Sequence, residues 1–397
     1  MKPLLISHFT ATSAIGLGCA ASWHTLCQQK SGLTPCAFAD VALDTYIGVV
    51  SGLEHPSLPA ELSEFDCRNN RLSQLALEQD QFSQAIERVS QRYGAARIGV
   101  FIGTSTSGIL QTELAYRQRD PLSGALPEAF NYRGTHSTFS VAQFVQSRLK
   151  LSGPALAVST ACSSSAKVFS SARRMLEAGW IDAALVGGVD SLCLTTLYGF
   201  NSLELLSPQP CRPYDRARDG ISIGEAAAFL LLERVPPSLD ANAILLSGCG
   251  ESSDAYHMST PHPQGRGAIQ AMIQALESAS LAPEDIDYIN LHGTATPSND
   301  NAEGAAVAHL FGANTPASST KGATGHTLGA AGGLEAVISA LALTHGIMPA
   351  GINTQTRDPS IDIHYLLEPR PQALRHVLSN SFGFGGSNCS LIFSRAN

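Results

Sequence analysis

The stretch that decides the fold covers residues 158–180 and reads VSTACSSSAKVFSSARRMLEAGW. The residues that lead into it, GPALAVST, form a short apolar run bounded by Gly-Pro, which is typical of a buried strand. After Cys162, apolar residues such as Phe169 and Leu176 recur at helical spacing until Gly179 offers a stop. The pattern therefore predicts a strand, a tight turn and a helix, with Cys162 at the junction.

The position of Cys162 gives it two possible roles. A helix N-terminus stabilises a thiolate relative to a thiol, and the thiolate is the nucleophilic form of cysteine. The alternative is a buried structural cysteine, which is the more common fate of a free thiol. Position alone leaves both roles open, so the rest of the chain has to decide between them.

The composition narrows the class of protein. The chain has 397 residues, of which 44% are hydrophobic and 15% charged, enough for one large core or two fused domains. A net charge of -8 argues against a general nucleic-acid binder or a membrane-surface protein. The nine cysteines form no CxxC pair, which predicts a reducing cytoplasm rather than a disulfide framework or a zinc module. No run reaches the ~20 apolar residues of a transmembrane helix.

Strand-like and helical patterns alternate along the chain, which predicts an α/β protein. The clearest internal boundary is ERVPPSLDAN, where Pro236 and Pro237 interrupt the pattern. It divides the chain into residues 1–236 and 237–397. Each half contains a reactive-looking residue followed by a helix of small residues, Cys162 in the first and His326 in the second, and this parallel indicates duplication.

Three stretches of the second half carry further candidate chemistry. In YINLHGTATPSND, His292 follows a strand-like run, and loops at strand ends commonly carry catalytic groups. In SSTKGATGHTLGAAGG, Lys321 and His326 lie in a Gly/Thr loop before an Ala/Gly-rich helix. In NSFGFGGSN, Phe384 stands among glycines whose backbone can adopt unusual angles. A structural histidine, a buried scaffold helix and an ordinary turn are the alternatives.

Together these stretches carry a resemblance to a known family. STACSSS, HGTATPSND, SSTKGATGHTLGAAGG and SFGFGGSN stand in the order found in the β-ketoacyl-ACP synthases and span nearly the whole chain. These are condensing enzymes of the thiolase superfamily. The resemblance implies a thiolase-like, duplicated α/β fold of five αβαβα layers, normally in a dimer. It also implies that residues 1–236 form the half with the nucleophile and residues 237–397 the half with the histidines.

The resemblance also implies a mechanism. Cys162 attacks an acyl thioester carried by acyl carrier protein and becomes acylated. His292 and His326 then stabilise the enolate that forms when malonyl-ACP loses CO2, and the carbanion attacks the acyl group to give a β-ketoacyl-ACP two carbons longer. Lys321 supports the histidines, and the backbone N–H groups of Cys162 and Phe384 form the oxyanion hole.

The same resemblance implies supporting roles for two residues and a reaction without a separate cofactor. Glu335, on the helix after His326, is expected to pair with Lys321. Phe384 is expected to gate the acyl pocket. Neither a metal nor an organic cofactor is expected, because the phosphopantetheine of acyl carrier protein delivers the substrate.

Several positions depart from the usual family pattern. Ala295 replaces a glycine in HGTATP, Ile221 stands where an aromatic residue is frequent, and Thr106 is polar where many fatty-acid enzymes line the acyl pocket with an apolar residue. Thr106 and Ile221 are therefore candidates for the acyl pocket. The departures favour a specialised polyketide- or polyene-type pathway, while fatty acid synthesis stays open.

Acyl carrier protein is acidic, so an acidic enzyme needs a local basic patch to bind it. Arg68 and Arg71, in DCRNNRL, are the candidate docking residues, and Arg212, Arg216 and Arg218 are further candidates. The alternative for each is an ordinary solvated surface arginine.

The sequence bears on three rival interpretations. Chain-length-factor subunits keep the fold but lose the nucleophile, whereas this chain keeps Cys162; a heterodimer-dependent ketosynthase with little activity alone remains the alternative. The partner subunit is thus either a second copy or a chain-length-factor-like subunit. A thiolase would need a second catalytic cysteine, and Cys389 stands in the wrong place for one. A cysteine hydrolase would share the acylation step but release a free acid.

Overall fold

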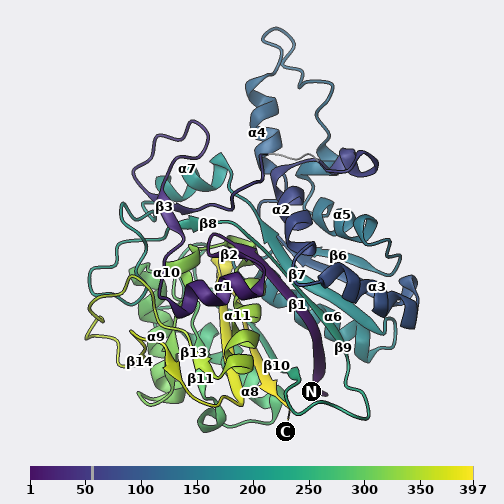
Figure 1. Cartoon of the computed structure of the whole chain (residues 1–397). Helices are drawn as coiled ribbons and strands as arrows, with labels where there is room; N and C mark the ends of the chain where they lie inside the picture. Colours follow the sequence, from purple (N-terminus) through teal and green to yellow (C-terminus); the bar gives the residue numbers. More distant parts are fainter. Residues whose placement is uncertain (55–57, 397) are drawn as a thin grey trace.

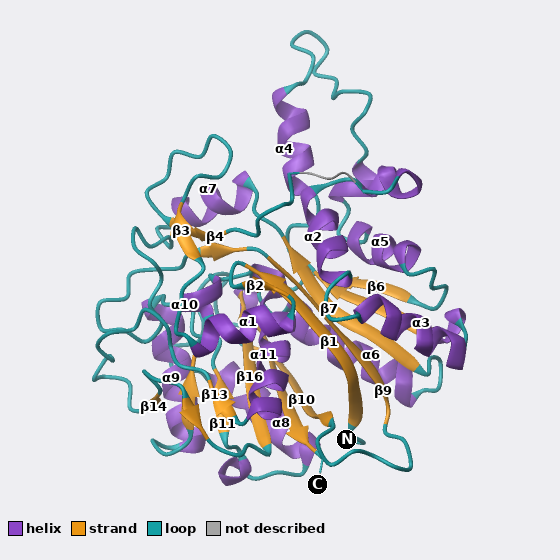
Figure 2. Ribbon diagram, in the orientation of Figure 1, coloured by secondary structure: helices purple, strands orange, loops and turns teal. Residues whose placement is uncertain are grey.

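The computed structural model describes residues 1–54 and 58–396. Strands run through the middle of the molecule, with helices on the outer faces and between the two halves (Figures 1 and 2). The α/β class predicted from the alternating patterns is confirmed.

The first half builds a sheet from strands that come mostly from residues before position 235. Their spatial order is β6 (Ala155–Val158), β5 (Ile98–Gly103), β7 (Ala183–Asp190), β9 (Ala226–Arg234) and β1 (Leu4–Ser13). Strand β5 pairs in parallel with both β6 and β7, while β9 is antiparallel to both β7 and β1.

The second half repeats this arrangement with its own strands. Their order is β12 (Pro316–Ser318), β11 (Tyr288–Asn290), β16 (His376–Gly383), β17 (Ser387–Arg395) and β10 (Ile244–Ser253), with β14 (His364–Tyr365) added beyond β12. Strand β11 is again parallel to two neighbours, and β17 is again antiparallel to both of its own. A short antiparallel pairing of β1 with β10 joins the two sheets. The predicted duplication is therefore visible in strand order and direction.

Helices complete the five layers. The first outer layer contacts the first sheet and contains α2 (Arg68–Leu77), α3 (Phe82–Tyr93) and α5 (Ser140–Arg148). Helices α6 (Ser164–Glu177) and α11 (Ala331–His345) pack against each other and against strands of both sheets, so they form the middle layer. Helices α8 (Arg266–Ala279) and α9 (Pro297–Phe311) pack together outside the second sheet. The αβαβα prediction is confirmed.

Each sheet is buried on both faces, which explains its nearly continuous apolar strands. Along the first sheet, Phe101 and Val186 face the core around α6 and α11, whereas Val100 and Leu185 face the outer core. The middle layer explains the apolar composition of residues 328–345. Leu328–His345 is the one described helical stretch with the length and hydropathy to cross a membrane, and 89% of it is buried inside the protein.

Small residues let the two middle helices meet at their N-termini. A Cβ added to Gly332, in the first turn of α11, would lie 2.8 Å from the backbone N of Ala166 on α6. A Cβ on Gly103, at the end of β5, would lie 2.3 Å from the backbone N of Ser165. A side chain at either position would push the backbone of α6 away. Glycine therefore allows the turn before α6 to lie next to the turn before α11.

Candidate active site

The nucleophile candidate lies in a strained turn. Ala161 has a left-handed backbone with φ 51°, and Cys162 follows it two residues before α6 begins at Ser164. The Ser164 hydroxyl donates to the Ala161 carbonyl and accepts from the backbone N–H of Thr160 at 2.9 Å. The turn is thus held by its own hydroxyl and backbone groups, and the Cys162 side chain lines a cavity.

Burial dominates the protonation of Cys162. Burial raises the pKa of its thiol to about 11, while the Lys321 charge and the backbone N–H of Phe384 act in the opposite direction. The resting group is therefore a thiol, which corrects the expectation that the helix N-terminus would leave a stabilised thiolate. Nucleophilic attack then requires a base next to the sulfur.

His326 is placed to be that base. Its Nε2 lies 3.0 Å from Sγ of Cys162. Its backbone is held on both sides, because its N–H donates to the Ser222 carbonyl at 2.7 Å and its carbonyl accepts from Gly224 N–H at 3.0 Å. Burial, together with the Lys321 charge, holds the pKa of His326 well below its usual value, so the imidazole is neutral and able to accept a proton.

Lys321 determines how His292 presents its ring. The Lys321 ammonium donates to the His292 carbonyl at 2.6 Å and lies 3.4 Å from Nδ1 of the same residue. Because an ammonium can only donate, Nδ1 must accept and Nε2 must carry the proton. Burial and the Lys321 charge hold the pKa of His292 well below its usual value. His292 is therefore a neutral hydrogen-bond donor at Nε2.

The predicted partner of Lys321 is in place. The Glu335 carboxylate forms a buried ion pair with the Lys321 ammonium, and both side chains are almost completely excluded from water. Burial raises the pKa of Glu335 to about 7 although Lys321 opposes the shift. A buried cation without this carboxylate would be costly, so the pair keeps Lys321 charged beside the histidines.

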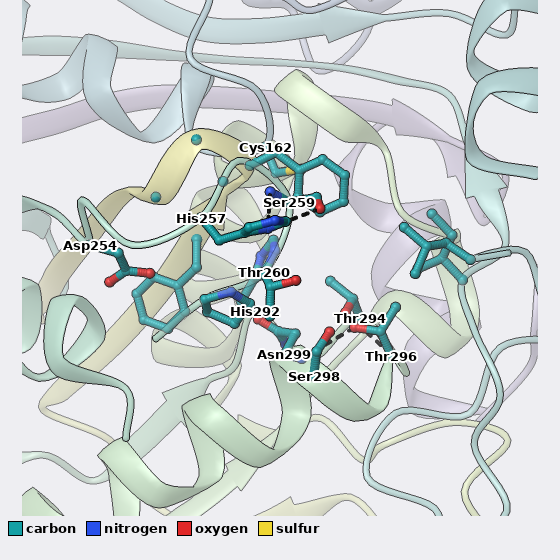
Figure 3. A pocket seen from close by; sticks show the side chains of 18 of the residues that line it. Cys162, Asp254, His257, Ser259, Thr260, His292, Thr294, Thr296, Ser298 and Asn299 are labelled. Carbon is teal, nitrogen blue, oxygen red and sulfur yellow. Dashed lines mark hydrogen bonds between the residues drawn. The ribbon is translucent and has the colours of Figure 1, made fainter. Parts of the chain in front are cut away.

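The three reactive groups line one cavity, and Figure 3 shows two of them, Cys162 and His292, among its other side chains. The His292 and His326 rings are edge-to-face with centroids 5.4 Å apart, and a nitrogen of each ring and the Cys162 sulfur lie within 4.8 Å of one another. The lining includes the apolar residues Phe200, Leu205 and Phe384. It also includes residues with hydroxyl or amide groups, namely Ser259, Thr260, Thr294, Thr296, Ser298 and Asn299.

The same three residues offer a donor set that a metal could use, since their ligand atoms lie within 4.8 Å of one another. The Lys321 ammonium beside His292 opposes a dication there, because like charges repel strongly in a buried site. The prediction of a metal-free site stays a prediction.

Comparison with known proteins identifies the family. Residues 11–237 match the family model for the N-terminal domain of β-ketoacyl synthases, and residues 244–355 match the model for the C-terminal domain. The chain belongs to the β-ketoacyl synthase family. The junction of the two models lies close to Pro236 and Pro237, although the division into residues 1–236 and 237–397 stays a prediction.

Known proteins of this family match the chain over nearly its whole length. A 3-oxoacyl-[acyl-carrier-protein] synthase 2 of Coxiella burnetii is 33% identical over 99% of both chains. A solved ketosynthase from Xenorhabdus doucetiae, in complex with its chain length factor, is 39% identical with a TM-score of 0.89 and covers 100% of this chain and 98% of its own. A β-ketoacyl synthase from Burkholderia phymatum is 28% identical with a TM-score of 0.89 over all of both chains.

These matches confirm the resemblance inferred from the four motifs, together with the predicted thiolase-like fold. They also confirm the predicted class of enzyme, an acyltransferase that forms C–C bonds as a ketosynthase. The interpretation of the chain as a thiolase or as a cysteine hydrolase is set aside.

Of the two acyl-pocket candidates, one lines the cavity and one does not. Ile221 is part of the lining. Thr106 is buried elsewhere, and its hydroxyl donates to Asp190 at 2.8 Å and accepts from Ser191 N–H at 3.2 Å. Thr106 is therefore not among the residues that line the cavity around Cys162, and its place in the acyl pocket stays a prediction. A buried hydroxyl needs hydrogen-bond partners, and a carboxylate supplies them better than an acyl chain.

The docking arginines also need correction. Arg68 is 8% exposed, and its guanidinium binds Glu225 through two nitrogens and Glu54 through the third. Because the charge is buried and matched, Arg68 does not offer a cation to a docking protein. Arg71 is partly exposed, but it forms a two-pronged pair with Asp66 at 2.6 and 2.7 Å.

The further docking candidates differ from one another. Arg218 is buried and binds Asp358, and Arg212 pairs with Asp219 at 3.1 Å. Arg216 is exposed and lies with Arg212 in a surface groove. Of the arginines predicted to dock the carrier, Arg216 is the most accessible to a partner.

Sequence reasoning missed Glu303, which holds the His292 turn. Its carboxylate accepts from the backbone N–H groups of His292 and Gly293, both at 2.7 Å, and from the Tyr214 hydroxyl at 3.1 Å. The residue is fully buried on α9. The only signal in the sequence was a lone carboxylate among small residues, which resembles an ordinary helical position.

A loop that sequence reasoning passed over also reaches the cavity. Asp254 and His257 lie between β10 and α8 and line the cavity with Phe384 (Figure 3). The loop is tied to the gate segment by two backbone hydrogen bonds, from Gly385 to Met258 at 2.7 Å and from Asp254 to Gly386 at 2.9 Å. The Phe384 segment is therefore packed against a second loop.

Proposed function

We propose that the protein condenses an acyl thioester with malonyl thioester, both on acyl carrier protein, through Cys162, His292 and His326. The single observation that carries this proposal is the meeting of one thiol and two neutral imidazoles in one cavity. A hydrolase would need one histidine and a water. A second buried donor suits a reaction that also develops an enolate oxyanion.

The first step acylates Cys162. His326 Nε2 accepts the thiol proton while the sulfur attacks the thioester carbonyl. The backbone N–H of Phe384, which already points at the sulfur, and that of Cys162 receive the developing oxyanion. When the tetrahedral intermediate collapses, the carrier thiolate leaves and takes the proton from His326.

The second step makes the new C–C bond. The malonyl thioester oxygen accepts hydrogen bonds from Nε2 of His292 and of His326, and the enolate forms as CO2 departs. The enolate carbon attacks the acyl group, the C–S bond to Cys162 breaks, and the thiolate takes up a proton from solvent by way of His326. His326 Nδ1 has no hydrogen-bond partner among the described residues, so its tautomer is free to serve both steps.

The cavity contains apolar and polar lining residues that suit the two parts of the substrate. Phe200, Leu205 and Ile221 provide an apolar wall for the acyl chain. Thr294 and Thr296 provide hydroxyls for the amides of a phosphopantetheine arm. The arm brings the substrate as a thioester, so the proposed reaction uses no metal and no separate cofactor.

The partners are a carrier protein and a second subunit. The solved ketosynthase from Xenorhabdus doucetiae is in complex with its chain length factor, and this chain is 39% identical to it. A chain-length-factor-like subunit is therefore the favoured partner over a second copy. This similarity also favours a specialised polyketide-type pathway over primary fatty acid synthesis. The proposed location is the cytoplasm.

Intact-protein mass spectrometry tests the proposal. The wild type is incubated with carrier protein loaded with a series of acyl groups, and its mass is expected to rise by one acyl group. Addition of malonyl carrier protein is then expected to remove this group as a β-ketoacyl product. Cys162→Ala should gain no acyl mass. Cys211→Ala, which removes another buried thiol near Lys321, is the matched control and should behave as wild type.

No acylation of the wild type, either alone or with a chain-length-factor-like subunit, would overturn the proposal. Acylation only with that subunit present would assign the alternative, a heterodimer-dependent ketosynthase.

A further inference from the structure

Part of the apolar cavity wall rests on a lightly anchored helix. Phe200, on α7 (Leu194–Ser202), lines the cavity, and its ring centroid lies 5.7 Å from that of Phe384. Leu194 and Leu197 are buried, whereas Tyr198 at 43% exposure typifies the outer face of α7. These two leucines are the buried residues of α7, so its position also depends on contacts other than core packing.

The N-terminus of α7 is held by a carboxylate from another helix. Glu113 on α4 (Ile109–Arg117) accepts from the backbone N–H of Leu194 at 2.9 Å and from that of Thr195 at 2.6 Å. Cys193, the residue at the helix cap, provides no capping side-chain hydrogen bond to any described residue. Glu113 therefore satisfies the free N–H groups that α7 does not cap itself, and its charge suits the positive end of the helix.

We propose that Glu113 is a positioning residue that sets acyl-chain selectivity by holding α7, and with it Phe200, against the cavity. The inference rests on the proposed function, because it concerns the acyl group that Cys162 accepts. A helix this short moves nearly as a rigid body, so releasing its first turn shifts a side chain less than two turns away. Glu113 itself is not among the cavity-lining residues and touches no reacting atom.

The test compares two acyl groups of different length. Second-order rate constants for acylation of Cys162 are measured with hexanoyl and dodecanoyl carrier protein for wild type, Glu113→Ala and Glu113→Gln. Glu113→Ala is expected to reduce the preference for one acyl group over the other, measured as the ratio of the two rate constants, about fivefold. A change of this size corresponds to the loss of a helix cap. Glu113→Gln keeps one acceptor oxygen and should give an intermediate ratio.

Two controls separate positioning from general damage. Alkylation of Cys162 by iodoacetamide needs no acyl wall, so Glu113→Ala should leave its rate within about twofold of wild type. Glu87→Ala, which removes an exposed carboxylate from α3, should leave the ratio of acylation constants unchanged.

A double-mutant cycle makes the inference specific to Phe200. In a Phe200→Ala background, Glu113→Ala should no longer change the ratio, because the side chain through which it acts is gone. An unchanged ratio in Glu113→Ala, an equal loss for both acyl groups, or a full effect in the Phe200→Ala background would each overturn the inference. If Glu113→Ala does not fold, Glu113→Gln carries the same comparison. An unacylated wild type would instead refute the proposed function.

Discussion

The two middle helices begin with the same turn but give the cavity different groups. Ala161 and Leu328 both have a left-handed backbone, with φ 51° and 53°, and each stands three residues before its helix starts. The residue after Ala161 is Cys162, whose side chain enters the cavity. The residue after Leu328 is Gly329, where a Cβ would lie 2.6 Å from Ser105 Oγ. One copy of the turn presents a nucleophile, and the other has no room for one.

The turns also differ in how they are held. In the first half, the Cys162 turn is held by serine hydroxyls and backbone groups. In the second half, buried charges hold the histidines, namely the Lys321–Glu335 pair and the Glu303 carboxylate. The two halves therefore share one backbone arrangement, and buried charged residues in the second half hold the donors that the enolate needs. Each prediction below tests this contrast.

The largest effect is expected from Lys321→Ala. It leaves the buried Glu335 carboxyl without its partner, which should lower the free energy of unfolding by about 3–5 kcal/mol. Urea denaturation measures the loss, and the double variant Lys321→Ala/Glu335→Leu should recover part of it. The matched control in the first half is Lys167→Ala, whose partner Glu251 is 4.0 Å away, with an expected loss below about 1 kcal/mol. Equal losses for the two lysines would contradict the contrast.

Glu303→Gln should separate the two steps of the reaction. An amide cannot accept from both His292 N–H and Gly293 N–H as the carboxylate does, so the His292 ring should shift. Condensation is expected to fall about 100-fold, since small displacements of a catalytic group have effects of this size. Acylation of Cys162 should change less than about threefold by intact-mass kinetics, because Glu303 holds the other turn. A parallel loss of both steps would show that Glu303 only stabilises the fold.

The rate at which Cys162 is alkylated should depend on pH in the way expected for a buried thiol. Because the thiol pKa is raised to about 11, the thiolate fraction should rise about tenfold per pH unit between pH 7 and 10. The rate of alkylation by iodoacetamide, followed by intact-protein mass at several pH values, measures this slope. The rate for Cys162→Ala gives the contribution of the other thiols, which is subtracted. A rate that levels off below pH 8 would instead indicate a thiolate–imidazolium pair with His326.

The smallest effect is expected from Ala295→Gly, which restores the glycine usual in the family motif. Ala295 has φ 70°, a conformation that is strained for any residue with a Cβ. The variant should be more stable by about 0.5 kcal/mol, because relief of strain exceeds the extra chain entropy of glycine. Ala302→Gly, inside α9, is the control and should lose about 1 kcal/mol. Thermal denaturation that ranks the two variants the other way would contradict this account.

Much of the architecture was accessible from the sequence because local patterns carried it. The strand-turn-helix at Cys162 and the parallel features of the two halves predicted the duplicated sheets, and the four motifs placed Cys162, His292 and His326 together. What failed depended on distant contacts. Arg68 reads as a surface cation until Glu225, 157 residues away, is brought against it. Thr106 and Glu303 likewise owe their roles to partners that no local spacing reveals.

The central claim is that Cys162 takes the acyl group with His326 as its base, and that His292 is needed only for the condensation. The most direct measurement follows the acyl mass on His292→Ala after malonyl carrier protein is added. The account predicts that His292→Ala still acquires the acyl group on Cys162 and then retains it, with no β-ketoacyl product. Discharge of the acyl group to product at the wild-type rate would contradict the assignment of the enolate donor to His292.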